Sequence, residues 1–142
     1  MADAQWFPLT GCLQQATERQ TAYVNSEIHL FKAGLTPTPS TTLADLVAVE
    51  ADYDTYAPET LAAWLGPILA PGSGYEILSP LVVFEVGASD PVLPNNIGGW
   101  WLQDAGGRVR IIGTFNPSLP MQLAGQGIPL SVLDIFPTGF TG

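Results

Sequence analysis

The amino-acid sequence predicts an all-β protein with a single β-sandwich or jelly-roll-like domain of about eight antiparallel strands. Three observations lead to this prediction. Stretches of alternating apolar and polar residues recur along the chain, turn signals separate them roughly every 8 to 15 residues, and helical periodicity is nearly absent. The clearest signal is Asp104-Ala105-Gly106-Gly107, which stands between the strand-like segments Gly98 to Gln103 and Arg108 to Phe115 and predicts a β-hairpin.

The apolar residues among the first 18 positions show neither helical nor strand periodicity, and this segment is predicted to form an N-terminal arm. The sandwich domain is therefore assigned to residues 19–142. The aromatic pair Trp6-Phe7 lies in a polar context near the start of the chain. Such a pair needs an apolar surface to bury against, either in the chain's own core or in a neighbouring molecule. The alternative to an arm is therefore a first strand that packs within the same chain.

The segment from Thr21 to Phe31 alternates small, mostly apolar residues with larger and more polar ones, which predicts a half-buried strand. The two prolines within residues 36–39 lack amide donors and predict a stiff, extended connector. Ser40 or Thr41 is then expected to cap one short helical turn that ends at Leu46.

Four further segments complete the predicted sandwich. Glu50, Asp52 and Asp54 occupy alternate positions, which favours a strand from Val47 to Tyr56 with one acidic face. The other predicted strands are Leu61 to Leu69, Tyr75 to Val86 with an interruption at Ser79-Pro80, and Ile128 to Phe136, and Asn116-Pro117 is expected to end the hairpin.

The composition restricts the partners that this chain can bind. Its 142 residues include 4 Lys and Arg against 13 Asp and Glu, for a net charge of −9. Nucleic-acid binding needs clustered cations, so no nucleic-acid partner is expected, and anionic membrane surfaces are disfavoured for the same reason. No run approaches the roughly 18 apolar residues of a membrane-spanning helix. The single cysteine, Cys12, excludes a disulfide within the chain.

Residue types that commonly act in catalysis are scarce in this sequence, so we expect that the protein is not an enzyme. His29 is the only histidine, it lies within a predicted strand, and no Gly-x-Ser-x-Gly motif accompanies it. A classical zinc site is excluded because its ligands are missing. Glu50, Asp52 and Asp54 could gather a calcium ion, but a solvated acidic face is the simpler interpretation. No catalytic residue, metal or cofactor is therefore predicted.

The neighbouring residues Trp100 and Trp101 should point to opposite faces of their strand. Trp100 is expected in the core. Trp101 is expected to cover the surface, to lie at an interface or to stack on a sugar ring.

Two segments resemble a known group of proteins. The first segment consists of Leu30-Phe31-Lys32 followed by residues 35–46 and 50–57, and its residues 35–46 contain Thr-Pro-Thr-Pro and Thr-Leu-Ala-Asp. The second segment consists of residues 98–107 followed by Gly113-Thr114-Phe115 and Pro120-Met121. This pattern resembles small accessory virion or fibre-type proteins of tailed phages and prophages over roughly residues 28 to 135. Thr55 stands where that group usually has glycine. The resemblance implies a role in structural assembly and supplies no catalytic residues.

The sequence therefore predicts a structural, self-assembling subunit of a virion surface or an extracellular filament, joined to its neighbours by exchange of strands or arms. Its partners would be other copies of itself and other virion proteins. The alternative is a carbohydrate-binding β-sandwich module that holds glycans on Trp101 or on a tyrosine near Tyr53 and Tyr56. The expected self-assembly residues are Trp6, Phe7, Ile128, Leu130, Val132, Ile135 and Phe136.

Overall fold

A computed structural model describes residues 5–6, 9–70, 74–136 and 140–141. Strands make up 44% of the structure and helices 16%, which confirms the all-β class. The elements are β1 (Gln5–Trp6), α1 (Leu9–Tyr23), β2 (Ser26–Lys32), α2 (Leu43–Val47), β3 (Glu59–Leu61), β4 (Leu65–Ala70), β5 (Gly74–Leu78), β6 (Val82–Glu85), β7 (Asn95–Gln103), β8 (Val109–Met121), β9 (Gly127–Leu130), β10 (Leu133–Phe136) and β11 (Phe140–Thr141).

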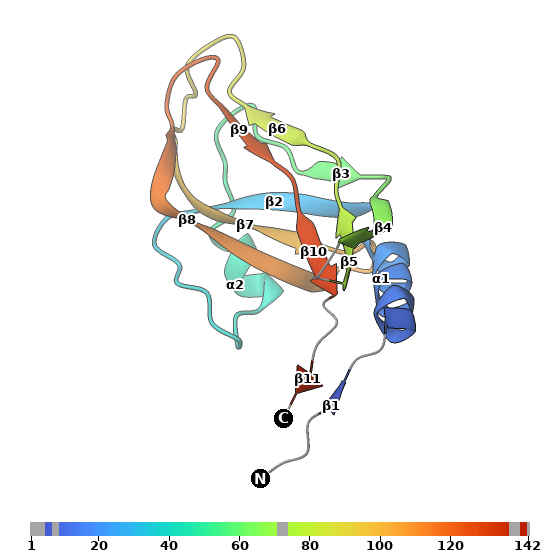
Figure 1. Ribbon diagram of the computed structural model, residues 1–142. Coiled ribbons are helices and arrows are strands. Elements are labelled where there is room, and N and C mark those ends of the chain that lie inside the picture. The colour runs from blue at the N-terminus through green and yellow to red at the C-terminus, as the bar shows by residue number, and fades with distance from the viewer. Residues whose placement is uncertain (1–4, 7–8, 71–73, 137–139, 142) are drawn as a thin grey trace.

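All strand pairs are antiparallel and form a sandwich-like arrangement (Figure 1). A four-stranded sheet has the order β3-β2-β7-β8, and a three-stranded sheet has the order β10-β5-β4. The pair β6-β9 continues the second layer, because β5 leads into β6 and β9 leads into β10. A separate two-residue pair, β1-β11, joins the two ends of the chain.

The main core lies between these two layers. Ile28 and Leu102 face it from the four-stranded sheet, and Ile77, Phe84 and Ile128 face it from the opposite layer. The alternation of side chains along each strand therefore places one face of every strand in a common apolar interior.

The helix α1 was not expected from the sequence. Its buried positions are Cys12, Ala16 and Tyr23, all of which belong to the main core. The Gln20 side-chain amide donates to the backbone oxygens of Trp64 and Gly66, at 2.9 and 2.7 Å. The boundary between an arm of residues 1–18 and a domain of residues 19–142 is therefore wrong, because α1 spans it and completes the core.

Several predicted strands have different limits in the structure. β2 begins at Ser26, since residues 21–23 belong to α1. Val47 to Tyr56 is not a strand and contributes only an isolated bridge between Glu50 and Phe31. The segment from Ile128 to Phe136 is divided into β9 and β10, and β8 continues past Asn116-Pro117 to Met121.

The predicted helical turn is confirmed as α2, but its cap lies one residue later than expected. The Thr42 hydroxyl accepts a hydrogen bond from the Asp45 amide, and the Asp45 carboxylate accepts one from the Thr42 amide. This reciprocal capping box satisfies amides that the short helix leaves unpaired. These hydrogen bonds also lower the pKa of Asp45.

A second, smaller core lies on the other face of the four-stranded sheet. Phe31 and Trp101 project there, and Leu46 of α2 packs on them. Leu35, Leu43 and Val49 surround this cluster. The connector after β2 therefore folds back over the sheet and covers a face that an open sandwich would expose.

Candidate functional site

Trp101 is not available for stacking on a ligand. Its side chain is fully buried, and its ring lies 4.5 Å from the His29 ring at an angle of 11°. Its indole N–H donates to Gln103 at 3.2 Å. The expectation of an exposed Trp101 is wrong because α2 and its connector cover this face. Trp100, on the opposite face, packs against the main core as expected, although it stays partly exposed.

The expected self-assembly residues fall into three groups. Ile128, Leu130 and Val132 are buried in the chain's own core, so they do not form an exposed contact surface. The backbone of Trp6 pairs in β1, and the backbones of Ile135 and Phe136 pair in β10, but their side chains lie outside the described part of the structure. Phe7 lies outside the described residues altogether.

His29 and Glu50 form a polar pair at the edge of the second core. The His29 Nδ1 atom lies 2.6 Å from Oε2 of Glu50, and the Tyr56 hydroxyl donates to the same oxygen at 2.7 Å. The Tyr56 oxygen accepts a hydrogen bond from the Leu30 amide at 3.1 Å. Burial, followed by the hydrogen bond to Glu50, raises the pKa of Tyr56.

This pair does not present a base to a substrate. The Nε2 atom of His29 is buried and has no hydrogen-bond partner among the described residues. Its distance of 3.7 Å from the Glu27 carboxylate is too long for a hydrogen bond. General base catalysis needs a reachable nitrogen lone pair, so the arrangement serves to tie β2 to the segment that follows α2.

The carboxylates of Glu50, Asp52 and Asp54 do not share a face. The Asp52 carboxylate accepts hydrogen bonds from Asn95 at 2.8 Å and from Lys32 at 3.1 Å. Both lower the pKa of Asp52, and the hydrogen bond from Asn95 has the larger effect. Asp54 is exposed. Within the described part of the chain, no group of three or more His, Cys, Asp or Glu residues is arranged to hold a metal ion.

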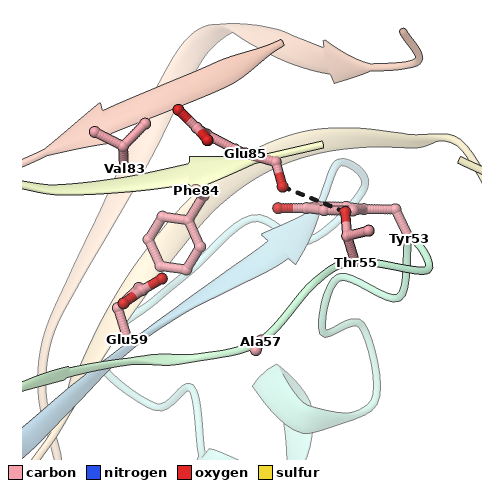
Figure 2. Close-up of a pocket in the computed structure, with 7 residues that line it drawn as sticks. All are labelled: Tyr53, Thr55, Ala57, Glu59, Val83, Phe84 and Glu85. Atoms are coloured by element: carbon pink, nitrogen blue, oxygen red, sulfur yellow. Dashed lines mark hydrogen bonds between the residues drawn. The ribbon is translucent and has the colours of Figure 1, made fainter. Parts of the chain in front are cut away.

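The structure contains a pocket of about 230 Å³ between the loop that precedes β3 and the strand β6 (Figure 2). Two segments form its walls, residues 53–59 on one side and residues 83–85 on the other. Its lining residues are Tyr53, Thr55, Ala57, Glu59, Val83, Phe84 and Glu85. The lining residues thus include two glutamates, a tyrosine and the apolar residues Ala57, Val83 and Phe84.

The Tyr53 hydroxyl is the most unusual group in this pocket. Tyr53 is 2% exposed as a whole residue, but its hydroxyl is not among the buried polar atoms that lack a partner, which in the described part of the chain are Ser26 Oγ, His29 Nε2 and Trp64 Nε1. Figure 2 shows this hydroxyl pointing toward β6 on the side of Phe84, whereas the Glu85 carboxylate lies on the other side of that strand. Burial, with a further contribution from the negative charge of Glu59, raises the pKa of Tyr53 to about 12. The hydroxyl is therefore protonated at neutral pH.

Hydrogen bonds of Thr55 connect the two walls of the pocket. Its hydroxyl donates to the backbone oxygen of Glu85 at 3.3 Å and accepts from the Gly87 amide at 3.1 Å. Sequence reasoning placed Tyr53 near a ligand but missed Glu59 and Glu85. Only the fold brings these residues together, since about 26 positions separate them in the chain.

A row of three leucines, of which the middle one, Leu78, is half-buried and the outer two are exposed, crosses the outer face of the three-stranded sheet. Leu133 and Leu65 both pair with Leu78 in register, so the three side chains lie in line across β10, β5 and β4. Leu65 is 61% exposed and Leu133 is 50% exposed, and Ile68 beside them is 49% exposed. The opposite face of this sheet carries Ile77, which is buried in the core.

Among the helices described, none has the length and apolar character needed to cross a bilayer. Comparison of the chain with models of protein families, with curated proteins and with solved structures found no match.

Proposed function

We propose that this chain is a structural subunit that associates with further copies of itself through the outer face of the β10-β5-β4 sheet. The observation that carries the proposal is the row Leu133, Leu78 and Leu65. Aligned apolar side chains on a sheet face are costly to leave in water, since their burial contributes about 25 cal/mol per Å².

The charge distribution restricts where two copies of the chain can meet. Each copy carries a net charge of −9, so two copies repel each other wherever their acidic surfaces meet. The leucine row itself carries no charge. A carboxylate residue, Glu76, pairs with Ile68, the exposed residue beside the row. Two identical faces can pair about a two-fold axis, because the same patch then meets itself.

The paired ends of the chain support a second contact, the exchange of arms. β1 and β11 form a ribbon of two residues each, with Trp6 opposite Phe140, which lies apart from the sandwich in Figure 1. So short a ribbon is marginal on its own, and pairing with a neighbouring copy would extend it. The low content of charged residues, 12%, and the resemblance to virion proteins support a place on a virion surface or in an extracellular filament.

Sedimentation velocity of purified protein over a range of concentrations tests the proposal. We expect the wild type to self-associate and the double variant Leu65→Ser/Leu133→Ser to dissociate. The control is Val92→Ser/Leu123→Ser, which removes two apolar side chains of comparable or greater exposure from loops outside the sheet. A monomeric wild type, or equal weakening by both variants, would refute the role of this face. Deletion of residues 1–8, which leaves α1 intact, separately tests the exchange of arms.

A further inference from the structure

We infer that the outer edge of β8 binds an extended segment of a partner protein, which adds an antiparallel strand to the four-stranded sheet and carries acidic residues at its C-terminal end. β8 is the last strand in the order β3-β2-β7-β8 and lies at the edge of this sheet (Figure 1). A free strand edge presents amides and carbonyls that an extended peptide can bind. This edge shares no residue with the leucine row of the β10-β5-β4 sheet, so its role is independent of self-association through that row.

The backbone groups of Ile112 and Thr114 face away from the sheet. The amide and the carbonyl of Leu30 on β2 both form hydrogen bonds with the segment that follows α2, so they point away from β7. Because backbone direction alternates in antiparallel pairs, Trp100, opposite Leu30, faces β8, and Gly113, opposite Trp100, faces β7. The residues on either side of Gly113 therefore face outward, and within the described ranges no segment forms a hydrogen bond with their amides or carbonyls on that side.

Apolar side chains on both faces of β8 stay half-buried. Ile111 and Phe115 pack against the main core, and Ile112 packs against the second core beneath α2. Both cores therefore reach the edge of the sheet without being closed there. An added strand with apolar residues would bury more of these three side chains, and such burial contributes about 25 cal/mol per Å².

The charges at the start of β8 favour acidic residues in the partner. Arg110 is the only charged residue of β8, and Arg108 directly precedes the strand. The Arg110 side chain donates to Asp104 at 2.8 Å, whereas the exposed Arg108 has no ion pair within the described ranges. When a strand adds in the antiparallel direction, its C-terminal end lies beside Arg108, where an acidic side chain can form the missing pair.

Amide hydrogen exchange measured by ¹H–¹⁵N NMR tests whether this edge is open and whether a peptide closes it. The Gly113 amide, which faces β7, is the internal reference. In the protein alone, the Ile112 and Thr114 amides should exchange about tenfold faster than the Gly113 amide, or faster still. A saturating amount of the acetylated peptide Thr-Val-Thr-Ile-Thr-Val-Asp-Asp should slow both edge amides by about tenfold and leave the Gly113 amide unchanged.

Matched peptides and variants identify what the edge recognises. A peptide with proline in place of isoleucine lacks a central amide donor and should not protect the edge. A peptide that ends in Lys-Lys should bind about threefold more weakly than the acidic one. Arg108→Gln should weaken binding of the acidic peptide by about threefold, whereas Lys32→Gln, which removes the same charge from β2, should bind as the wild type does.

Three results would overturn the inference. The first is exchange of the Ile112 and Thr114 amides as slow as that of Gly113 in the protein alone, or no protection by the acidic peptide. The second is protection that rises with protein concentration in the absence of peptide, which would assign the edge to a second copy of the chain. The third is equal binding of the acidic and Lys-Lys peptides, or equal weakening by the two variants, which would exclude an acidic partner.

Discussion

The Nδ1 atom of His29 lies 2.6 Å from Oε2 of Glu50, which makes a histidine on β2 the partner of a carboxylate 21 positions later in the chain. The Tyr56 hydroxyl donates to the same oxygen. Glu50 therefore holds the segment after α2 against the four-stranded sheet. This connection explains why residues 47–56 follow the sheet closely without forming a strand in it.

Replacement of Glu50 by alanine should destabilise the protein by about 1–3 kcal/mol, because the Tyr56 hydroxyl and the His29 ring both lose their acceptor. Urea unfolding followed by tryptophan fluorescence measures the change. Asp54→Ala is the control, since Asp54 is exposed, and it should shift the free energy of unfolding by less than about 0.5 kcal/mol. Equal stability of the Glu50 variant and the wild type would show that the network contributes nothing.

Gly99→Ala should destabilise the sheet by about 3 kcal/mol or prevent folding. A Cβ atom at this position would collide with the Gly113 backbone oxygen and with the Phe31 ring. The backbone oxygen cannot move without breaking the pairing of β7 with β8. Gly106→Ala in the hairpin turn is the matched control, because its added carbon would come no closer than 3.3 Å to the Asp104 carboxylate. A urea midpoint of Gly99→Ala equal to that of the control would contradict the packing seen here.

Thr42→Ala should lower the free energy of unfolding by about 1 kcal/mol, because it removes the side-chain half of the α2 capping box. The measurement is again the urea midpoint, compared with that of Ser40→Ala. Ser40 is exposed, and only its backbone amide takes part in a hydrogen bond, to Thr38. The prediction fails if the two variants lose the same stability.

Stability should fall at acidic pH, and Asp104 should be one cause. The backbone amide of Arg108, together with the Arg110 side chain at 2.8 Å and the Gly106 amide, lowers the pKa of Asp104. A carboxyl whose pKa is lower in the folded state stabilises the fold above its unfolded pKa of about 3.9, and this stabilisation is lost as the pH falls through the folded pKa.

The urea midpoint measured between pH 7 and pH 2.5 tests this pH dependence. Asp104→Asn should be less stable than the wild type at pH 7, and the difference should shrink at the acidic end, where the wild-type carboxyl is also neutral. Asp52 has a lowered pKa as well, so the variant keeps part of the acid sensitivity. A difference between the two proteins that stays constant with pH would rule out the charge of Asp104 as its source.

Local chemistry made the hairpin and α2 predictable. The Asp104 carboxylate accepts hydrogen bonds from the backbone amides of Gly106 and Arg108 in the same turn. Thr42 and Asp45, three positions apart, each accept a hydrogen bond from the other's backbone amide. Such short-range hydrogen bonds follow directly from residue type and spacing. The β class also followed, because alternation reflects the burial of one strand face.

The helix α1 and the pocket depend on contacts between distant parts of the chain. The buried side of α1 is made by Cys12, Ala16 and Tyr23, which give a weaker apolar pattern than a row of large aliphatic residues. The alternating carboxylates of residues 50–54 suggested a strand, but Glu50 and Asp52 are paired separately with residues of the four-stranded sheet. Spacing in the sequence cannot reveal partners that only the folded chain supplies.

The hydrogen bond from the Tyr23 hydroxyl to Asp134, 2.8 Å long, joins residues that are 111 positions apart. On the ribosome, Tyr23 is made early and Asp134 near the end of translation of these residues. The contacts of α1 with β10 can therefore form only after β10 has left the exit tunnel, later than its contacts with β4 and β5. A ribosome stalled before β10 would carry a chain whose first helix still lacks one of the strands it packs against, although β4 and β5 are already made.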